Sequence, residues 1–197
     1  MNICAFGDSV THASYIKNSW TNLLRLYLED NSQYEIELFN LGINGNTSDD
    51  ILKRIEIECD PRQPDVIFFA YGINDSRYIP ELDRCLVEID EFKRNTQKII
   101  EIAKKFTDII FFVGPVLGDD RQLDLYYESV YDKKVFEASR SKGYDSVLEE
   151  IATKNDCKYI HLFDKLESTD FIDGLHPNET GHKKMFEVIK EHLTTDK

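Results

Sequence analysis

The chain alternates between short apolar runs and longer segments in which apolar residues recur with the period of an α-helix. Short runs rich in Ile, Val and Phe that end at glycine or a polar turn are typical of buried β-strands. The predicted strands are Asn2–Phe6, Ile36–Leu41, Val66–Tyr71, Ile109–Val113 and Lys158–Leu162.

The segments between these strands each carry one apolar face, as amphipathic helices do. The first helix has Trp20, Leu24 and Leu28 on that face and either Asn18 or Ser19 as its N-cap. Further helices are predicted after Thr47 and Ser48, from Leu86 to Ala103, from Val135 to Ile151, and from Pro177, a favoured first helical residue, to Leu193.

Strands that alternate with helices predict βαβ units and a parallel sheet with both faces covered. Right-handed crossovers then give a doubly wound, flavodoxin-like α/β fold, that is, a three-layer α/β/α sandwich around a five-stranded parallel sheet. The length of 197 residues and the lack of a linker or internal repeat indicate a single domain over residues 1–197. Ligands of such folds bind outside the carboxyl ends of the strands.

Composition removes several classes of protein. The hydrophobic fraction of 41% is too high for a disordered chain, and a net charge of −13 should repel the phosphates of nucleic acids. No apolar stretch approaches the roughly 18 residues of a membrane span, and the start of the chain lacks the basic region of a signal peptide. We therefore expect a cytoplasmic protein without nucleic-acid partners.

The four cysteines show no metal-binding or redox spacing. Cys4 and Cys157 fall within or beside predicted strands, and no CxxC pair occurs. Together with Cys59 and Cys85 they are expected to be buried, reduced thiols with no metal role.

Polar residues follow the predicted strands at the edge where a ligand would bind. Gly7-Asp8-Ser9 follows the first strand, a glycine-rich loop that includes Gly45 follows the second, and Asn74-Asp75 follows the third. The loop before the last helix contains Asp173 and His176. A hydroxyl, a carboxamide and an Asp/His pair are therefore expected to converge there.

A serine hydroxyl becomes a useful nucleophile only beside a base, usually an imidazole held by a carboxylate. His176 is the best candidate, since Pro177 favours an extended backbone there and Asp173 lies three residues earlier. His161 is placed in a strand, and His182 and His192 are placed on the polar side of the last helix. His12 is close to Ser9 in sequence, and chemistry alone does not exclude it as the base.

Negative charge grows on the carbonyl oxygen when an ester is attacked, so hydrogen-bond donors must face that oxygen. Ser9 and Gly45 can each offer a backbone N–H, and glycine allows a ligand to approach the backbone closely. Asn74 can offer its side-chain amide. We predict that Ser9, Gly45 and Asn74 form an oxyanion hole.

These residues carry a family resemblance. Gly7-Asp8-Ser9-Val10 resembles the first motif of the GDSL (SGNH) hydrolases, and Asn40–Thr47 is similar to the second, whose glycine corresponds to Gly45. Gly72–Asp75 resembles the third motif and Asp173–Pro177 the DxxHP motif. The four motifs occur in the family order over nearly the whole chain.

The resemblance implies a metal- and cofactor-independent esterase or acylhydrolase that acts on a small-molecule ester. Ser9 would be the nucleophile, His176 the base and Asp173 the group that orients it. Many members have glycine a few residues after the serine, where this chain has Ala13 and Ser14. Asp8 and Asp75 are expected chiefly to bind loop backbone groups.

Substrate contacts are expected from loops around Ser9. The long segment Gly118–Lys133 follows the fourth strand, and loops of that length are often functional. It contains Arg121, Tyr126 and Tyr127 as candidate substrate contacts, although Tyr127 and Tyr131 fit the start of a buried helix equally well. Further candidates are Asp8, Tyr15, Trp20 and Tyr78.

We expect a short acyl group, such as acetate on a sugar or small alcohol, because no long apolar stripe suggests a lipid groove. Transfer of the acyl group to an alcohol instead of water stays open. Two other functions are considered: a metal-assisted phosphoesterase that uses Asp8, Asp50, Asp75 and His176, and a catalytically inactive binding module. The sequence gives no indication of the oligomeric state.

Overall fold

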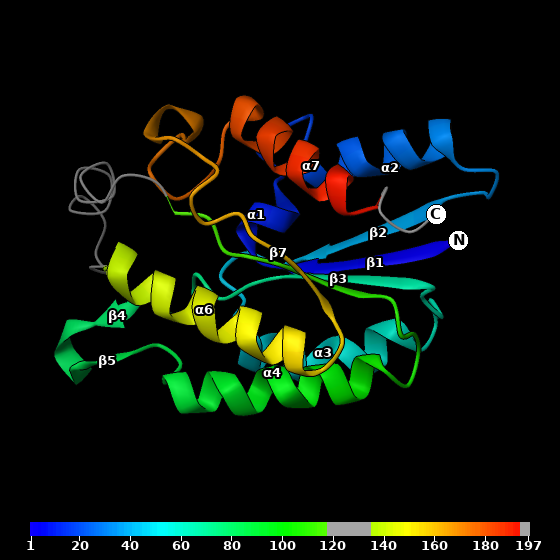
Figure 1. The fold of residues 1–197 in the computed structure, drawn as a ribbon. Coiled ribbons are helices and arrows are strands. Elements are labelled where there is room, and N and C mark those ends of the chain that lie inside the picture. The colour runs from blue at the N-terminus through cyan, green and yellow to red at the C-terminus, as the bar shows by residue number, and fades with distance from the viewer. Residues whose placement is uncertain (118–134, 194–197) are drawn as a thin grey trace.

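The computed structural model describes residues 1–117 and 135–193, and these residues form the expected three layers (Figure 1). The central sheet has five parallel strands in the order β2-β1-β3-β6-β7. Their bounds are β1 Asn2–Gly7, β2 Glu37–Gly42, β3 Val66–Ala70, β6 Ile110–Val113 and β7 Lys158–Ile160. This order is the flavodoxin-like one, so the predicted fold class is confirmed.

Helices cover both faces of the sheet (Figure 1). Helices α3 (Ser48–Cys59), α4 (Ile89–Ala103) and α6 (Ala138–Lys154) pack on one face. Helices α1 (Ser9–His12), α2 (Trp20–Asn31) and α7 (Glu179–Leu193) pack on the other. The two buried clusters that result hold the sheet in place, and its carboxyl edge is left for the loops.

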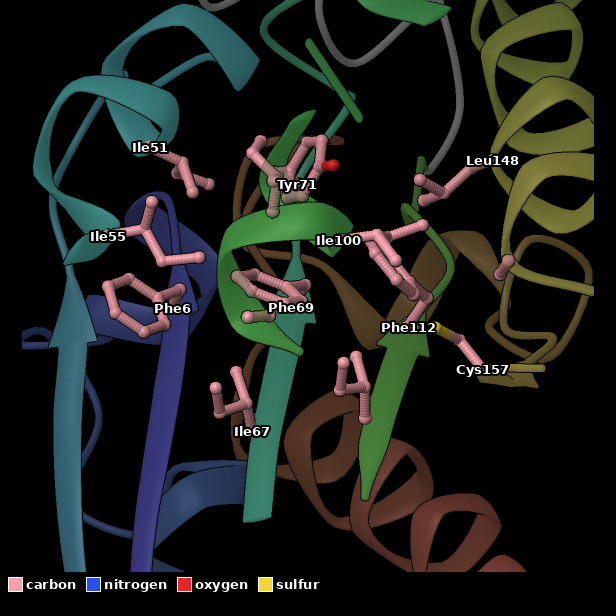
Figure 2. Close-up of a cluster of buried hydrophobic side chains, with 14 of the residues drawn as sticks. Phe6, Ile51, Ile55, Ile67, Phe69, Tyr71, Ile100, Phe112, Leu148 and Cys157 are labelled. Carbon is pink, nitrogen blue, oxygen red and sulfur yellow. The ribbon is translucent and has the colours of Figure 1, made fainter. Parts of the chain in front are cut away.

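Successive residues of each strand enter opposite clusters, as the pleat requires. In β3, Phe68 packs towards α2 and α7, whereas Phe69 packs towards α3, α4 and α6. Figure 2 shows Phe69 between Phe6 and Phe112, with ring centroids 5.5 and 5.1 Å away. Burial of one such ring contributes about 1.5–3 kcal/mol, so this row of aromatic rings fixes the register of β1, β3 and β6.

Three predicted helix starts are wrong by a few residues. Helix α7 begins at Glu179 and not at Pro177, because Asn178 caps it by accepting the N–H groups of Thr180 and Gly181 at 2.9 and 3.1 Å. Pro177 instead pairs with Phe171 in an isolated bridge. Helices α6 and α4 likewise begin three residues later than predicted.

The structure also contains short elements that the sequence pattern does not reveal. Strands β4 (Tyr78–Ile79) and β5 (Arg84–Cys85) form a hairpin around the 3₁₀ turn η1 (Pro80–Leu82), and a second turn, η2, covers Ser168–Asp170. Two-residue strands are too short to show an alternating pattern. The four cysteines are buried and unpaired, as expected. Within the described residues, no helix has the length and apolar character to span a bilayer.

Candidate active site

Segments that are far apart in the sequence bring polar side chains together at the carboxyl edge of the sheet. Ser9 follows β1 and begins α1, Gly45 lies between β2 and α3, and Asn74 follows β3. Asp173 and His176 lie in the loop that leads to α7. The structure thus brings together the five residues that the sequence analysis selected as triad and oxyanion hole.

Glycines allow the short helix α1 to lie directly against the strand ends. A Cβ on Gly7 would be 2.1 Å from Thr11 Oγ1, and one on Gly42 would be 2.2 Å from the backbone nitrogen of His12. Asp8 caps α1, since its Oδ1 accepts the Val10 N–H at 2.9 Å. This close approach presents Ser9 at the sheet edge in a tight strand-to-helix turn.

Ala13 directly follows α1 as its C-cap, in the stretch where members of the family that this chain resembles often have glycine. Ala13 has φ 45° and ψ 37°, and its N–H donates to the Ser9 carbonyl at 2.9 Å. An L-residue with a side chain adopts this left-handed conformation at a cost of about 1–2 kcal/mol. The turn beside the site is therefore formed without glycine.

Ser9, His176 and Asp173 form a continuous hydrogen-bonded chain. Ser9 Oγ is 3.0 Å from His176 Nε2, and His176 Nδ1 is 2.7 Å from Asp173 Oδ2. A carboxylate accepts only, so Nδ1 carries the proton and Nε2 is left to accept the serine O–H. This is the arrangement in which an imidazole can remove a proton from a serine.

A closed turn sets the distance between the acid and the imidazole. The Ile172 N–H donates to the His176 carbonyl at 2.8 Å, and Gly174 has φ 82°, which favours glycine. Within the turn, Asp173 Oδ1 accepts the N–H groups of Leu175 and His176 at 3.0 and 2.7 Å. Both carboxylate oxygens of Asp173 are therefore held by the same short segment.

These hydrogen bonds determine the charge state of Asp173. Burial by itself raises the pKa of this carboxyl, but the bonds from the His176 ring and from the two backbone amides outweigh burial. The pKa of Asp173 therefore lies below its ordinary value. The carboxylate remains ionised at neutral pH and can stabilise a positive charge on His176.

A second histidine lies behind the first, where the sequence analysis did not place it. His182 was expected on the polar side of the last helix, but it is fully buried, with Nδ1 accepting the Trp20 N–H at 3.3 Å. Its Nε2 is 3.4 Å from the hydroxyl of Tyr15, whose ring packs edge-on against His176 at 5.5 Å. Burial, with a smaller effect of His176, lowers the pKa of His182 to about 4, so this ring is neutral.

The oxyanion candidates line a pocket of about 220 Å³ beside Ser9. Its described lining residues are Ser9, Asn44, Gly45, Asn74, Phe136, Leu175 and His176. Gly45 has φ 78°, and a Cβ there would meet no atom within 4 Å. Glycine is thus needed at this position for the backbone conformation and not for packing.

The side chain of Asn74 has one hydrogen committed to the loop and one weakly held. Its Nδ2 donates to the Asn46 carbonyl at 3.1 Å and lies 3.4 Å from Asp8 Oδ2, close to the limit of a hydrogen bond. The second N–H makes only this long contact and is therefore the one available to a developing oxyanion.

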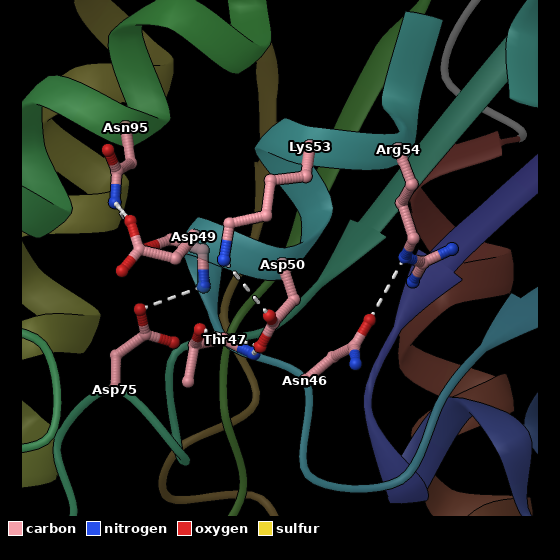
Figure 3. Close-up of polar contacts among 9 residues, drawn as sticks. Asn46, Thr47, Asp49, Asp50, Lys53, Arg54, Asp75 and Asn95 are labelled. Carbon is pink, nitrogen blue, oxygen red and sulfur yellow. Dashed lines mark hydrogen bonds and ion pairs between the residues drawn. The ribbon is translucent and has the colours of Figure 1, made fainter. Parts of the chain in front are cut away.

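Two buried carboxyls lie behind these donors and bind backbone groups, as expected. Asp8 holds Val10, and Asp75 Oδ1 accepts the Ser48 N–H at 2.9 Å at the start of α3 (Figure 3). Burial raises the pKa of Asp8 to about 6 and that of Asp75 to about 7, despite these hydrogen bonds. Asp8 is only 2% exposed and is not among the residues that line the pocket, although it was a candidate for substrate contact.

The other candidate substrate contacts lie outside the described residues or away from the pocket lining. Arg121, Tyr126 and Tyr127 lie outside the described residues. Tyr78 is not among the lining residues; its hydroxyl donates to Asp83, and Arg140 lies 4.2 Å over its ring. Trp20 cannot form a wall of the site, because it is fully buried in the core between α2 and the sheet.

Two apolar lining residues were missed from the sequence. Phe136 and Leu175 belong to a small buried cluster with Ile73 and Leu117. Leu175 lies inside the Asp173–Pro177 motif, so its position next to the base could have identified it as a lining residue. Phe136 follows the long loop, and nothing in its sequence position indicates a place in the pocket.

Comparison with known proteins finds a matching family model and similar structures. The model of the GDSL-like lipase/acylhydrolase family matches residues 5–184. An uncharacterised lipoprotein of Bacillus subtilis (strain 168), YqeF, is 28% identical over 145 residues. That match covers 69% of this chain, and the chain spans 58% of the length of that relative.

Solved structures share the fold at low sequence identity. A lipase/acylhydrolase from Enterococcus faecalis is 22% identical, with a TM-score of 0.76 over 98% of this chain and 95% of its own. Axe2, an acetylxylan esterase from Geobacillus stearothermophilus, is 18% identical, with a TM-score of 0.78 over 98% and 94% of the two chains.

Proposed function

Because the chain belongs to the GDSL-like lipase/acylhydrolase family, we propose that it is a serine esterase that cleaves a small ester through an acyl-enzyme on Ser9. The observation that carries the proposal is the continuous contact of Ser9 Oγ with His176 Nε2 and of His176 Nδ1 with Asp173. These contacts supply the nucleophile, its base and the group that orients the base.

In the acylation step Ser9 Oγ attacks the ester carbonyl while His176 Nε2 takes its proton. The imidazolium that forms is stabilised by the Asp173 carboxylate, whose lowered pKa keeps it ionised. The C–O bond to the alcohol then breaks, and the same Nε2 proton passes to the leaving oxygen. In the second step a water molecule, activated by His176, releases the acid and restores the serine.

Negative charge on the carbonyl oxygen would be met by the backbone N–H groups of Ser9 and Gly45 and by the weakly held N–H of Asn74. Donors that are held in place before the substrate arrives need little reorganisation during the reaction. Such preorganised donors are worth about 10²–10³ in kcat each.

The pocket favours a short acyl group. Its volume of about 220 Å³, as bounded by the described residues, is below the ~300–1,000 Å³ of sites for drug-sized ligands. Leu175 and Phe136 give it an apolar wall suited to a methyl group. Axe2 is named as an acetylxylan esterase, and we take acetylated sugars as the first substrates to assay.

Two of the carboxylates in the metal-assisted alternative, Asp50 and Asp75, already bind backbone groups. Asp50 Oδ2 accepts the Thr47 N–H at 3.1 Å, and Asp75 Oδ1 holds Ser48 (Figure 3). Both therefore serve to begin α3, and this leaves the serine mechanism as the better-supported reading of the site.

The test compares hydrolysis of p-nitrophenyl acetate by the wild type and Ser9→Ala, each with and without EDTA. We expect turnover that survives EDTA and falls at least a thousandfold in the variant. Equal rates in the two proteins, or loss of turnover with EDTA, would overturn the serine mechanism. A panel of acetyl, butyryl and octanoyl esters then tests the acyl group, and a tenfold preference for octanoyl would refute the short-chain proposal.

A further inference from the structure

We propose that Arg54 is a positioning residue that sets the geometry of the oxyanion hole by binding the end of β1 and the loop after β2, which lead to its donors. This inference rests on the proposed esterase function. Arg54 lies on α3, outside the pocket lining, and nothing in the triad touches it. Its guanidinium points to the ends of β1 and β2, where the Arg54 Nε–H donates to Asn46 Oδ1 at 2.9 Å (Figure 3).

One guanidinium contacts both the end of β1 and the loop after β2. Besides Asn46, Arg54 contacts the carbonyl of Gly7 through Nη2 at 3.4 Å. Gly7 is two residues before Ser9, and Asn46 directly follows Gly45. Arg54 therefore connects the end of β1, which leads to Ser9, with the loop that carries Gly45.

The third donor, the side-chain amide of Asn74, is also connected to Arg54. The carbonyl of Asn46 accepts one hydrogen of Asn74 Nδ2 at 3.1 Å, and this bond decides where the second hydrogen points. Arg54 holds the side chain of Asn46, and Asn46 in turn holds the amide of Asn74. Gly45 and Asn74 are thus linked to Arg54 through Asn46 alone, and Ser9 is linked to it through Gly7 and Asp8.

The loop between β2 and α3 has few other supports near the site. Ile43, Asn44 and Gly45 are exposed, and a Cβ at Gly45 would meet nothing within 4 Å. The loop is tied by the Ile43 N–H to the Gly7 carbonyl at 3.0 Å and by its own turn from Asn46 to Ile43 at 3.1 Å. With so little packing, the bond from Arg54 to Asn46 adds to these backbone bonds and to the Asn74–Asn46 bond in fixing Gly45.

The surroundings of Arg54 keep its guanidinium rigid. The side chain is only 14% exposed, its Nη1 pairs with Glu58 at 3.0 Å, and its plane lies over the Phe6 ring at 5.2 Å. A planar fork with several donors can satisfy Glu58, Asn46 and Gly7 together, whereas a lysine ammonium on a flexible stem cannot reproduce that geometry. Arg54→Lys therefore keeps the positive charge and removes the simultaneous contacts with Glu58, Asn46 and Gly7.

Arg62 provides a matched control. Its guanidinium also lies 5.2 Å from a phenylalanine ring, that of Phe39, and its Nη1 donates to the Glu58 carbonyl at 2.7 Å. Its own carbonyl accepts the side chain of Asn2, at the start of β1 and so at the opposite edge of the sheet from Ser9. Arg62→Lys thus makes the same chemical change away from the oxyanion hole.

The experiment measures kcat and KM for p-nitrophenyl acetate in the wild type, Arg54→Lys and Arg62→Lys. A misplacement of about 1 Å at a reacting centre can cost about 10² in rate, so we expect kcat of Arg54→Lys to fall about 10–10²-fold with KM within about twofold. Arg62→Lys should keep wild-type kcat. A purely structural role for Arg54 would instead lower the melting temperature and leave kcat of the folded fraction unchanged.

Two further variants make the result decisive. Asn46→Ala removes the acceptor of the Arg54 bond, leaves the Arg54–Glu58 pair in place, and should reproduce the fall in kcat even if Arg54→Lys fails to fold. In an Asn74→Ala background, Arg54→Lys should have a smaller effect than in the wild type, because part of the hole is already lost.

Unchanged kcat in both Arg54→Lys and Asn46→Ala, an equal fall in Arg62→Lys, or full additivity with Asn74→Ala would overturn the inference. Turnover that does not depend on Ser9 would instead overturn the proposed function, so the two failures can be told apart.

Discussion

Asp75 should give this protein a pH-dependent stability that can be measured without any substrate. The side chain is fully buried, Oδ1 accepts the Ser48 N–H at 2.9 Å, and Oδ2 has no hydrogen-bond partner among the described residues. Burial, with a small contribution from the nearby Asp8, raises the pKa of Asp75 from 3.8 to about 7 against the effect of the Ser48 bonds. The folded state therefore holds the proton of Asp75 more tightly than the unfolded state does.

The sign and size of the effect follow from that difference. Between the unfolded pKa of 3.8 and the folded pKa of about 7 the folded state binds more protons, so the free energy of unfolding falls as pH rises. The slope contributed by Asp75 approaches 1.4 kcal/mol per pH unit, or roughly 4 kcal/mol in all, and levels off above pH 7.

The perturbation is Asp75→Asn, which keeps an oxygen for the Ser48 N–H and removes the titration. Urea unfolding of both proteins at pH 4.5 to 8.5, followed by the fluorescence of the buried Trp20, gives their free energies of unfolding. The amide placed at the unpartnered oxygen costs about 1–3 kcal/mol at every pH. We expect the difference in free energy of unfolding, variant minus wild type, to rise by about 3 kcal/mol between pH 4.5 and 7 and not to change further above pH 7.

A core variant without a titratable group, Ile55→Val, serves as the control, and its difference from the wild type should be the same at every pH. Stability curves of Asp75→Asn and the wild type that run parallel across this range would refute the reasoning, since the buried carboxyl would then titrate as it does in the unfolded chain.

Three further predictions concern the site and its scaffold. Asn74→Ala should lower kcat for p-nitrophenyl acetate about 10²–10³-fold. The control Asn95→Ala removes a buried amide bonded to Ser48 and Asp49, and it should lower the melting temperature and leave kcat unchanged. Equal kcat values in the two variants would contradict the assignment of Asn74 to the oxyanion hole. Asp173→Asn should lower kcat about 10⁴-fold in the same assay through loss of the correct imidazole tautomer, and a fall of less than tenfold would remove Asp173 from the triad. Asp156→Gly should raise the free energy of unfolding by about 0.5 kcal/mol in urea titrations. The exposed Asp156 has φ 57°, a conformation that glycine adopts without strain. A variant less stable than the wild type would contradict this prediction.

The sequence predicts the sheet and the site edge well, because both depend on strong local patterns. The runs that become β1 and β3 are buried on both faces and therefore nearly all apolar. Gly7 and Gly42 lie where the chain must turn closely past α1, and a side chain at either position would collide with α1. Such constraints leave a clear trace in the sequence.

Features that depend on tertiary contacts could not be predicted from local sequence patterns. His182 follows a helical period that predicts a polar face, yet Tyr15 and the Trp20 backbone meet it and bury it. Trp20 was placed on the apolar face of the first predicted helix and was also a candidate for the site wall, and the packing of α2 on the sheet shows that it belongs to the core. Phe136 reaches the pocket from beyond a long loop, a contact that no local pattern encodes.

The most direct test of the acyl-enzyme account is covalent labelling with a fluorophosphonate, followed by peptide mapping by mass spectrometry. The account predicts a single adduct on Ser9, loss of esterase activity in proportion to labelling, and no adduct in His176→Ala, because the hydroxyl then lacks its base. An enzyme that hydrolyses p-nitrophenyl acetate at full rate while Ser9 stays unlabelled, or that is labelled at another residue with loss of activity, would contradict it.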